Sequence, residues 1–189
     1  MNQHIPAIGH LESAAAILSM WEETRVHAAE LDVMIREFVP GDEGAFRRLN
    51  EEWISDYFSM EGKDAEALAN PGKTILEPGG RIFFAIRGGE FVGCCALLAM
   101  APGEFEVAKM AVTKSARGAG IGRALLARII AEARASGISR LYLETNRQLA
   151  TAIRLYESAG FRHLTRPRVF PSPYERANVF MELRFDESI

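Results

Sequence analysis

The chain has 189 residues, of which 48% are hydrophobic and 25% are charged, and its formal net charge at pH 7 is −3. This composition is ordinary for one globular domain, and the slightly acidic balance excludes a general attraction to nucleic acid. The sequence contains neither an apolar stretch long enough to cross a bilayer nor a charged-then-apolar leader, so we expect a cytoplasmic protein without a membrane partner.

The first predicted element is an amphipathic helix over Leu11–Leu31, where apolar residues recur at helical spacing. We treat residues 1–32 as an N-terminal helical extension and residues 33–189 as the main domain. The apolar stripe of the helix needs a covering surface, which its own domain, a second copy of the chain in a homodimer or a neighbouring domain would supply. The sequence leaves these alternatives open.

The main domain is predicted to open with a strand and two helices. The strand covers Val33–Val39, and Pro40-Gly41-Asp42 is a turn and helix-start signal before a helix over Ala45–Phe58. A second, shorter helix over Lys63–Ala69 ends at Asn70-Pro71-Gly72, because proline and glycine do not continue a helix.

Three strands follow. The segments Arg81–Arg87 and Glu90–Met100 alternate in polarity around Gly88-Gly89, a pair typical of a two-residue hairpin turn. The next strand covers Phe105–Val112.

The two cysteines, Cys94 and Cys95, are adjacent in an apolar run, so their side chains are expected to point to opposite faces of a strand. None of the four histidines makes a recognisable metal-binding cluster with them. We therefore interpret both as small core residues and expect neither a disulfide nor a metal site.

The most informative segment is Lys109–Leu126, in which an extended apolar stretch passes through a glycine-rich turn into a strong helical pattern. Its three glycines let the main chain turn tightly, and the first turn of the helix offers free N–H groups and the positive end of the helix dipole. This arrangement is typical of a phosphate-binding loop. Its spacing matches neither the P-loop pattern nor the dinucleotide-binding pattern.

The C-terminal part is predicted to contain three more strands and one more helix. A strand over Arg140–Thr145 precedes a helix that includes Ala152 and ends at Gly160, the position expected of a left-handed residue after a helix. Strands over Phe161–Leu164 and Asn178–Phe185 follow, separated by a proline-rich loop or lid.

Two of these segments resemble motifs of the GNAT superfamily of acyl-CoA N-acyltransferases. The pattern R-x-x-G-x-G at Arg117, Gly120 and Gly122 resembles the pyrophosphate-binding motif, and Ala152-Ile-Arg-Leu-Tyr156 resembles the second motif. The resemblance covers roughly residues 33 to 185. It implies an α/β fold with a mixed, mostly antiparallel central sheet of six to seven strands, flanked by about four helices, in addition to the N-terminal helix.

The resemblance also implies an acetyl-CoA site that needs no metal. The implied cofactor-binding residues lie on the strand, on the glycine-rich loop and on the second motif: Met110, Ala111, Val112, Arg117, Gly118, Ala119, Gly120, Ile121, Gly122, Arg123, Asn146 and Tyr156. Leu149 stands where the common pattern has an asparagine, so Asn146 is expected to contact the cofactor, to contact the acceptor, or to cap a turn.

The expected chemistry is direct attack of an amine on a thioester, which needs a neutral amine, a polarised carbonyl and a proton for the departing thiolate. Tyr156 matches the superfamily's usual general acid. Glu106 aligns with a glutamate base, and its spacing of four from Met110 predicts that both side chains face the same side of the sheet. A free main-chain N–H of the Met110–Val112 strand would polarise the carbonyl.

The acceptor side is expected at the helix over Ala45–Phe58 and at the proline-rich loop, with these candidates: Trp53, Asp56, Tyr57, Phe58, Arg168, Tyr174 and Arg176. An arginine there would favour an acceptor that carries a carboxylate. We therefore predict an N-acetyltransferase for a small-molecule amine or an amino-acid-like acceptor. The alternatives are a protein lysine or N-terminal acetyltransferase and a non-catalytic acyl-CoA sensor.

The segment Glu144-Thr145-Asn146 together with residues 172–178 resembles a bacterial subgroup often fused to MarR-type regulators.

Overall fold

The structure is a computed structural model, and it describes residues 32–168 and 172–185. The helix expected over Leu11–Leu31, and with it all but the last residue of the predicted extension, lies outside the described residues.

Within the described residues the sheet has seven strands: β1 (Met34–Glu37), β2 (Arg81–Arg87), β3 (Glu90–Ala101), β4 (Glu104–Val112), β5 (Arg140–Thr145), β6 (Arg162–Leu164) and β7 (Val179–Arg184). The α-helices are α2 (Glu43–Tyr57), α3 (Gly62–Ala69), α4 (Ile121–Ala135) and α5 (Ala150–Ser158). A π-helical turn over Gly72–Leu76 and a 3₁₀ turn over Lys114–Ala116 complete the set. None of the helices in these ranges is both long and apolar enough to cross a membrane.

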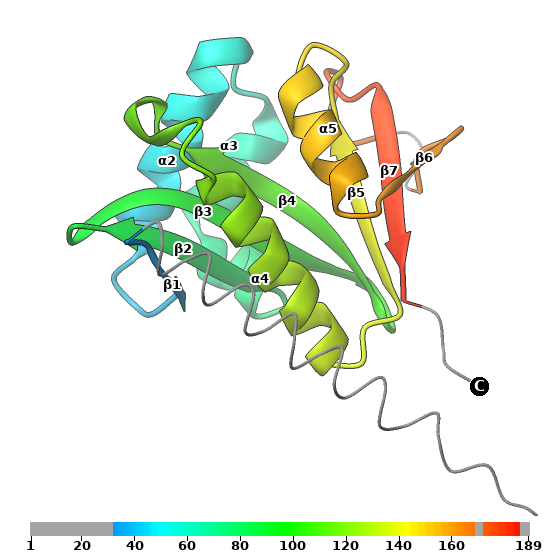
Figure 1. Cartoon of the computed structure of the whole chain (residues 1–189), viewed down its shortest axis with the longest axis horizontal. Coiled ribbons are helices and arrows are strands. Elements are labelled where there is room, and N and C mark those ends of the chain that lie inside the picture. Colours follow the sequence, from blue (N-terminus) through cyan, green and yellow to red (C-terminus); the bar gives the residue numbers. More distant parts are fainter. Residues whose placement is uncertain (1–31, 169–171, 186–189) are drawn as a thin grey trace, which may run out of the picture.

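The strands lie in the order β1-β2-β3-β4-β5-β7-β6 (Figure 1). Every neighbouring pair is antiparallel except β4 and β5, which run parallel. The sheet therefore consists of two antiparallel ladders, β1–β4 and β5–β7, joined where β4 meets β5. The predicted mixed, mostly antiparallel fold is confirmed.

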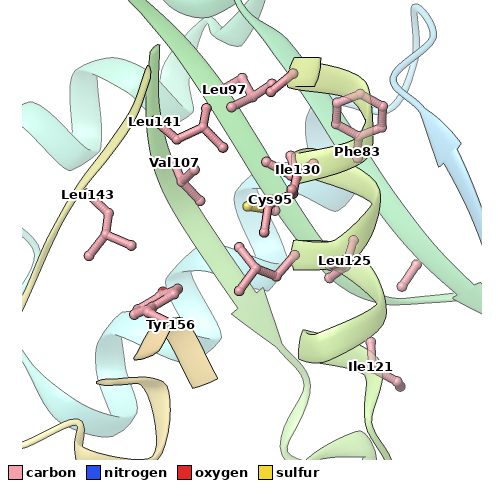
Figure 2. Packing of buried hydrophobic residues seen from close by; sticks show 14 of the residues in the cluster. Phe83, Cys95, Leu97, Val107, Ile121, Leu125, Ile130, Leu141, Leu143 and Tyr156 are labelled. Atoms are coloured by element: carbon pink, nitrogen blue, oxygen red, sulfur yellow. The ribbon is translucent and has the colours of Figure 1, made fainter. Parts of the chain in front are cut away.

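Helices cover both faces of the sheet. One face carries α4 and α5, and its buried side chains form what we term the α4-side core, which includes Phe83, Cys95, Val107, Leu125 and Tyr156 (Figure 2). The other face carries α2 and α3, and its α2-side core includes Phe46, Leu49, Leu68, Phe84 and Cys94. Cys94 and Cys95 thus point to opposite faces, as predicted, and both are fully buried.

A glycine lies just before the start of α4, and another lies just after the end of α5. Gly120 has a φ of 79° immediately before α4, and Gly160 has a φ of 94° just after α5. Both angles lie in the left-handed region, which glycine adopts without a steric penalty. After α5 the Phe161 N–H donates to the Tyr156 carbonyl at 3.1 Å, and the Gly160 N–H donates to Glu157 at 3.0 Å, a Schellman ending. Gly160 therefore ends α5 in the predicted manner.

Candidate active site

A cavity opens where β4 and β5 separate. The two strands pair only from Glu104 to Glu106 with Arg140 to Tyr142, and beyond these positions they diverge (Figure 1). The cavity at this divergence has a volume of about 850 Å³, within the range of small-molecule sites. Residues from both sides of the sheet line it, so groups from α2 and α3 meet groups from α4 and α5.

A β-bulge at Lys109 changes which way the side chains of β4 point. The single residue Cys95 on β3 lies opposite two residues of β4, Lys109 and Met110, and Lys109 has a φ of 52°. Met110 therefore packs on the α4-side core together with Val107, whereas Glu106, the neighbour of Val107, lies on the other face. The prediction that Glu106 and Met110 face the same side is wrong, because the bulge adds one residue between them.

One end of the cavity is formed by the glycine-rich loop and the start of α4. Gly118 and Gly120 both have positive φ angles, 81° and 79°. At Gly122 a β-carbon would lie 3.4 Å from Met110 Cε, so a larger residue would fill the cradle. The first N–H groups of α4 have no acceptor within the helix, and Arg123 adds a positive charge beside them. This end of the cavity is suited to a phosphate group.

Some of the predicted cofactor-binding residues have only their main chain available. Ala111 and Ile121 are 1% exposed and pack in the core. The side chain of Arg117 turns toward the protein: its Nε donates to the Val112 carbonyl at 3.0 Å, and its guanidinium pairs with Asp56 at 2.8 Å. Arg117 therefore braces the loop against α2.

Tyr156 lies in the cavity wall on α5. Its ring packs on Phe161 with 5.9 Å between centroids, and its hydroxyl lies 3.7 Å from Met110 Sδ. Only 8% of the residue is exposed, and this burial raises the pKa of the phenol above its usual value. The hydroxyl therefore keeps its proton at neutral pH and is available as a donor.

Glu106 lies in the wall of the cavity on the α2 side of the sheet. Its carboxylate has neither a hydrogen bond nor an ion pair with any described residue. Burial and, to a smaller extent, the negative charge of Glu144 raise the pKa of Glu106, and the positive charge of Lys109 lowers it; together they place this pKa at about 7. A carboxyl group that titrates near neutral pH is suited to accept a proton from an amine.

A buried ionic cluster beside Glu106 joins α3, β4 and the C-terminal loop. Asp64 is fully buried, lies 2.7 Å from Lys109 Nζ and accepts two hydrogen bonds from Arg176, at 2.6 and 2.8 Å. Although burial alone would raise the pKa of Asp64, the hydrogen bonds from Arg176 and Lys109 hold it at about 2. The Tyr174 hydroxyl accepts a further hydrogen bond from Lys109 at 2.8 Å. Sequence reasoning missed Asp64 and Lys109 as site residues, because nothing local signals partners 45 and 112 positions away.

The aromatic candidates on the acceptor side are brought together. Trp53, Tyr57 and Phe58 form a continuous wall at the end of α2, with ring centroids 5.4 to 6.3 Å apart. Tyr174 from the C-terminal loop lines the same cavity. These rings offer an apolar surface to a ligand.

The polar candidates have internal partners. Arg168 pairs with Glu104 and is not part of the cavity wall, whereas Arg176 lines the cavity within the ionic cluster. The Asn146 side chain accepts a hydrogen bond from the Gln148 N–H at 2.9 Å and donates one to the Arg176 carbonyl at 2.6 Å. Of the roles considered for Asn146, this geometry is that of a turn cap.

Comparison with known proteins identifies the family. Residues 46–161, which are more than half of the chain, match the model of the Acetyltransferase (GNAT) family. The chain belongs to this family.

Curated relatives of this GNAT protein include an IAA acetyltransferase of Azospirillum brasilense. The two are 47% identical over 112 residues, which cover 59% of this chain and 71% of the relative. A mycothiol acetyltransferase of Thermobispora bispora is 33% identical over 141 residues, or 70% of this chain. The chain spans only 48% of the length of that relative.

Solved structures agree with the GNAT fold. A GNAT-family acetyltransferase from Staphylococcus aureus superimposes with a TM-score of 0.72 at 24% identity, over 80% of this chain and 98% of the other. An acetyltransferase from Salmonella typhimurium, whose structure contains acetyl-CoA, gives a TM-score of 0.64 at 23% identity, over 83% of this chain and 96% of the other. At these identities the comparison establishes the shared fold.

GNAT enzymes use acetyl-CoA, and the residues present in this chain fit that cofactor. The α4 N-terminus and Arg123 would hold the pyrophosphate, and the absence of a side chain at Gly122 keeps the cradle open. Among residues 32–168 and 172–185, no group of three or more histidine, cysteine, aspartate or glutamate side chains is arranged to hold a metal ion.

Proposed function

We propose that the protein is a cytoplasmic acetyl-CoA-dependent N-acetyltransferase that acts on the primary amine of a small molecule. The observation that carries the proposal is the separation of β4 from β5, beside which the glycine-rich loop, Tyr156 and Glu106 line one cavity. The reaction needs these three parts: an anchor for the cofactor phosphates, an acid for the departing thiol and a base for the amine.

Each part of the site has one task. When bound, acetyl-CoA supplies an acetyl group that is activated as a thioester. Glu106 accepts a proton from the acceptor ammonium and leaves a neutral amine, which is the nucleophile. Main-chain N–H groups of β4 beyond the stretch paired with β5 stabilise negative charge on the carbonyl oxygen. Tyr156 donates its proton to the sulfur as the C–S bond breaks, and the second proton that the nitrogen loses as the amide forms restores the Tyr156 phenol.

The names of the relatives do not select one acceptor for this chain, since one refers to IAA and the other to mycothiol. The first experiment is therefore release of CoA thiol from acetyl-CoA by purified full-length protein. The panel contains aromatic amines, polyamines, amino acids, aminoglycosides and lysine peptides. Turnover of a small amine with 1:1 formation of its N-acetyl product supports the proposal.

Matched variants separate catalysis from folding. Glu106→Gln is expected to lose about a hundredfold or more of kcat/KM while still binding acetyl-CoA. Glu90→Gln, on the exposed β2–β3 hairpin, is expected to keep full activity. The proposal fails if acetyl-CoA does not bind, or if it binds and no amine in the panel is acetylated. Full activity of Glu106→Gln would remove Glu106 from the mechanism.

A further inference from the structure

The charged groups around Glu106, which we term the acceptor end of the cavity, determine which charges an acceptor can carry. The cations here are Lys109 and Arg176, and both are already paired with carboxylates. Lys109 is held by Asp64, and its side chain is 5% exposed. Arg176 binds both oxygens of Asp64 and also lies 3.1 Å from Glu61. Each cation is already balanced by a buried carboxylate, so a ligand carboxylate would meet little unbalanced positive charge here.

Two other carboxylates at the same end, Glu106 and Glu144, are not paired with cations of the described residues. Glu106 has neither a hydrogen bond nor an ion pair with any described residue. Glu144 accepts hydrogen bonds from two neutral hydroxyl groups, those of Tyr142 and Ser172, and forms no ion pair in the described part of the chain. The acceptor end therefore offers negative charge to a ligand.

The phosphate end has the opposite character. Arg123 and Arg154 both line the cavity near the glycine-rich loop and α5, and neither forms an ion pair with any residue in the described ranges. Within the described part of the chain, the Arg154 guanidinium donates one hydrogen bond, to the Thr151 hydroxyl at 3.3 Å. Cations without carboxylate partners thus lie where an anionic cofactor would bind, and paired cations lie where the acceptor would bind. The cavity is electrically polarised along its length.

We propose that the acceptor is a primary amine with no carboxylate beside its amino group, and with a flat or apolar body. Its ammonium group meets Glu106 and Glu144, and its body packs on the wall of Trp53, Tyr57 and Phe58. A carboxylate next to the amine would approach the same two acids, and the described residues supply no unpaired cation at this end to balance it, which disfavours an amino acid. The inference rests on the proposed function and narrows it.

The test compares three forms of one scaffold. Tryptamine, tryptophan and tryptophanamide share the indole ring, and tyramine, tyrosine and tyrosinamide form a second set. The amide keeps the size of the amino acid and removes its negative charge. We expect kcat/KM for the amine and for the amide to exceed that for the amino acid by about tenfold or more, since opposing like charges is costly.

Each outcome decides the inference separately from the proposed function. If the amino acid is acetylated with the same kcat/KM as its amine, the inference is overturned. If the kcat/KM of the amide is as low as that of the amino acid, the argument from charge is overturned. If neither set is turned over, calorimetric binding to the CoA-loaded protein must give the same ranking, and no binding refutes the inference. Acetylation of other acceptors in that case would leave the N-acetyltransferase function standing. Failure to bind acetyl-CoA would remove both.

A variant tests the role of the ion pairs. Asp64→Asn removes the carboxylate that balances Lys109 and one of the two that balance Arg176, so discrimination against tryptophan is expected to fall by about fivefold or more while tryptamine turnover changes less. Circular dichroism and thermal melting check that this buried substitution folds. Glu61→Gln, which removes the more exposed partner of Arg176, is the milder version of the same change. An unchanged tryptamine-to-tryptophan ratio in a folded variant of either kind contradicts the proposal.

Discussion

Replacing Glu106 by glutamine separates the cost of burying a charge from its use in catalysis. Burial and the neighbouring Glu144 raise the pKa of Glu106 from 4.5 to about 7 in the folded protein. The folded state therefore binds the proton more tightly than the unfolded state, and stability falls as pH rises between these two values. The pKa difference corresponds to roughly 3 kcal/mol above pH 7, taking about 1.4 kcal/mol for each unit.

Glutamine has the same size and never ionises. We therefore expect Glu106→Gln and wild type to have similar free energies of unfolding near pH 4.5, and the variant to be more stable by up to about 3 kcal/mol at pH 8.5. For a domain of this size that is a difference of several degrees in Tm. The same substitution is expected to lower kcat/KM about a hundredfold or more and to abolish the rise in activity through pH 7.

Calorimetric unfolding at the two pH values and a pH profile of kcat/KM measure these effects. Glu90→Gln serves as the control, because that hairpin carboxylate is exposed and lies outside the cavity wall. A glutamine variant with no stability advantage at pH 8.5 over pH 4.5 would refute the assignment of a raised pKa to Glu106.

Three further predictions concern other parts of the site. Tyr156→Phe is expected to lower kcat roughly tenfold to a hundredfold and to leave the calorimetric Kd for acetyl-CoA unchanged, because the hydroxyl acts on the departing thiol; a weaker Kd with unchanged kcat would contradict this role. Gly120→Ala forces alanine into a φ of 79° and should cost about 1 kcal/mol of unfolding free energy and weaken acetyl-CoA binding; equal melting and binding curves would argue against the strain. Cys94 and Cys95 are fully buried, and burial raises the pKa of the Cys94 thiol to about 12, so neither should react with a disulfide reagent until the protein is denatured; rapid labelling of native protein would contradict this.

Much of the fold could be predicted because local physics dictates it. Gly120 and Gly160 mark helix limits that require positive φ, which few other residues tolerate. The helical spacing of Ile121, Leu125 and Ile129 predicts that one face of α4 is buried, and all three side chains are buried in the structure. These signals need only neighbouring residues, so the sequence shows them directly.

Two features could not be predicted in the same way: the face of the sheet to which each β4 side chain points, and the buried ionic cluster. Lys109 adopts a φ of 52° although it is not glycine, so no residue type announces the bulge that moves Glu106 and Met110 to opposite faces. Asp64 stands at the start of α3, where an aspartate usually reads as a helix-start residue. Its true partners, Lys109 and Arg176, are brought to it only by the tertiary fold.

The two antiparallel ladders share few backbone hydrogen bonds, because β4 and β5 pair over a short stretch, although the α4-side core packs against both. Each antiparallel ladder is held by its own long run of backbone hydrogen bonds, whereas the junction has only three register pairs. A molecule lying in the gap touches both ladders and supplies cross-links where the backbone supplies none. Ligand binding should therefore slow amide hydrogen exchange more in β5 and β7 than in β2 and β3, whose bonds lie within one ladder. The bound molecule then adds contacts between two halves of one sheet that otherwise meet mainly through the α4-side core.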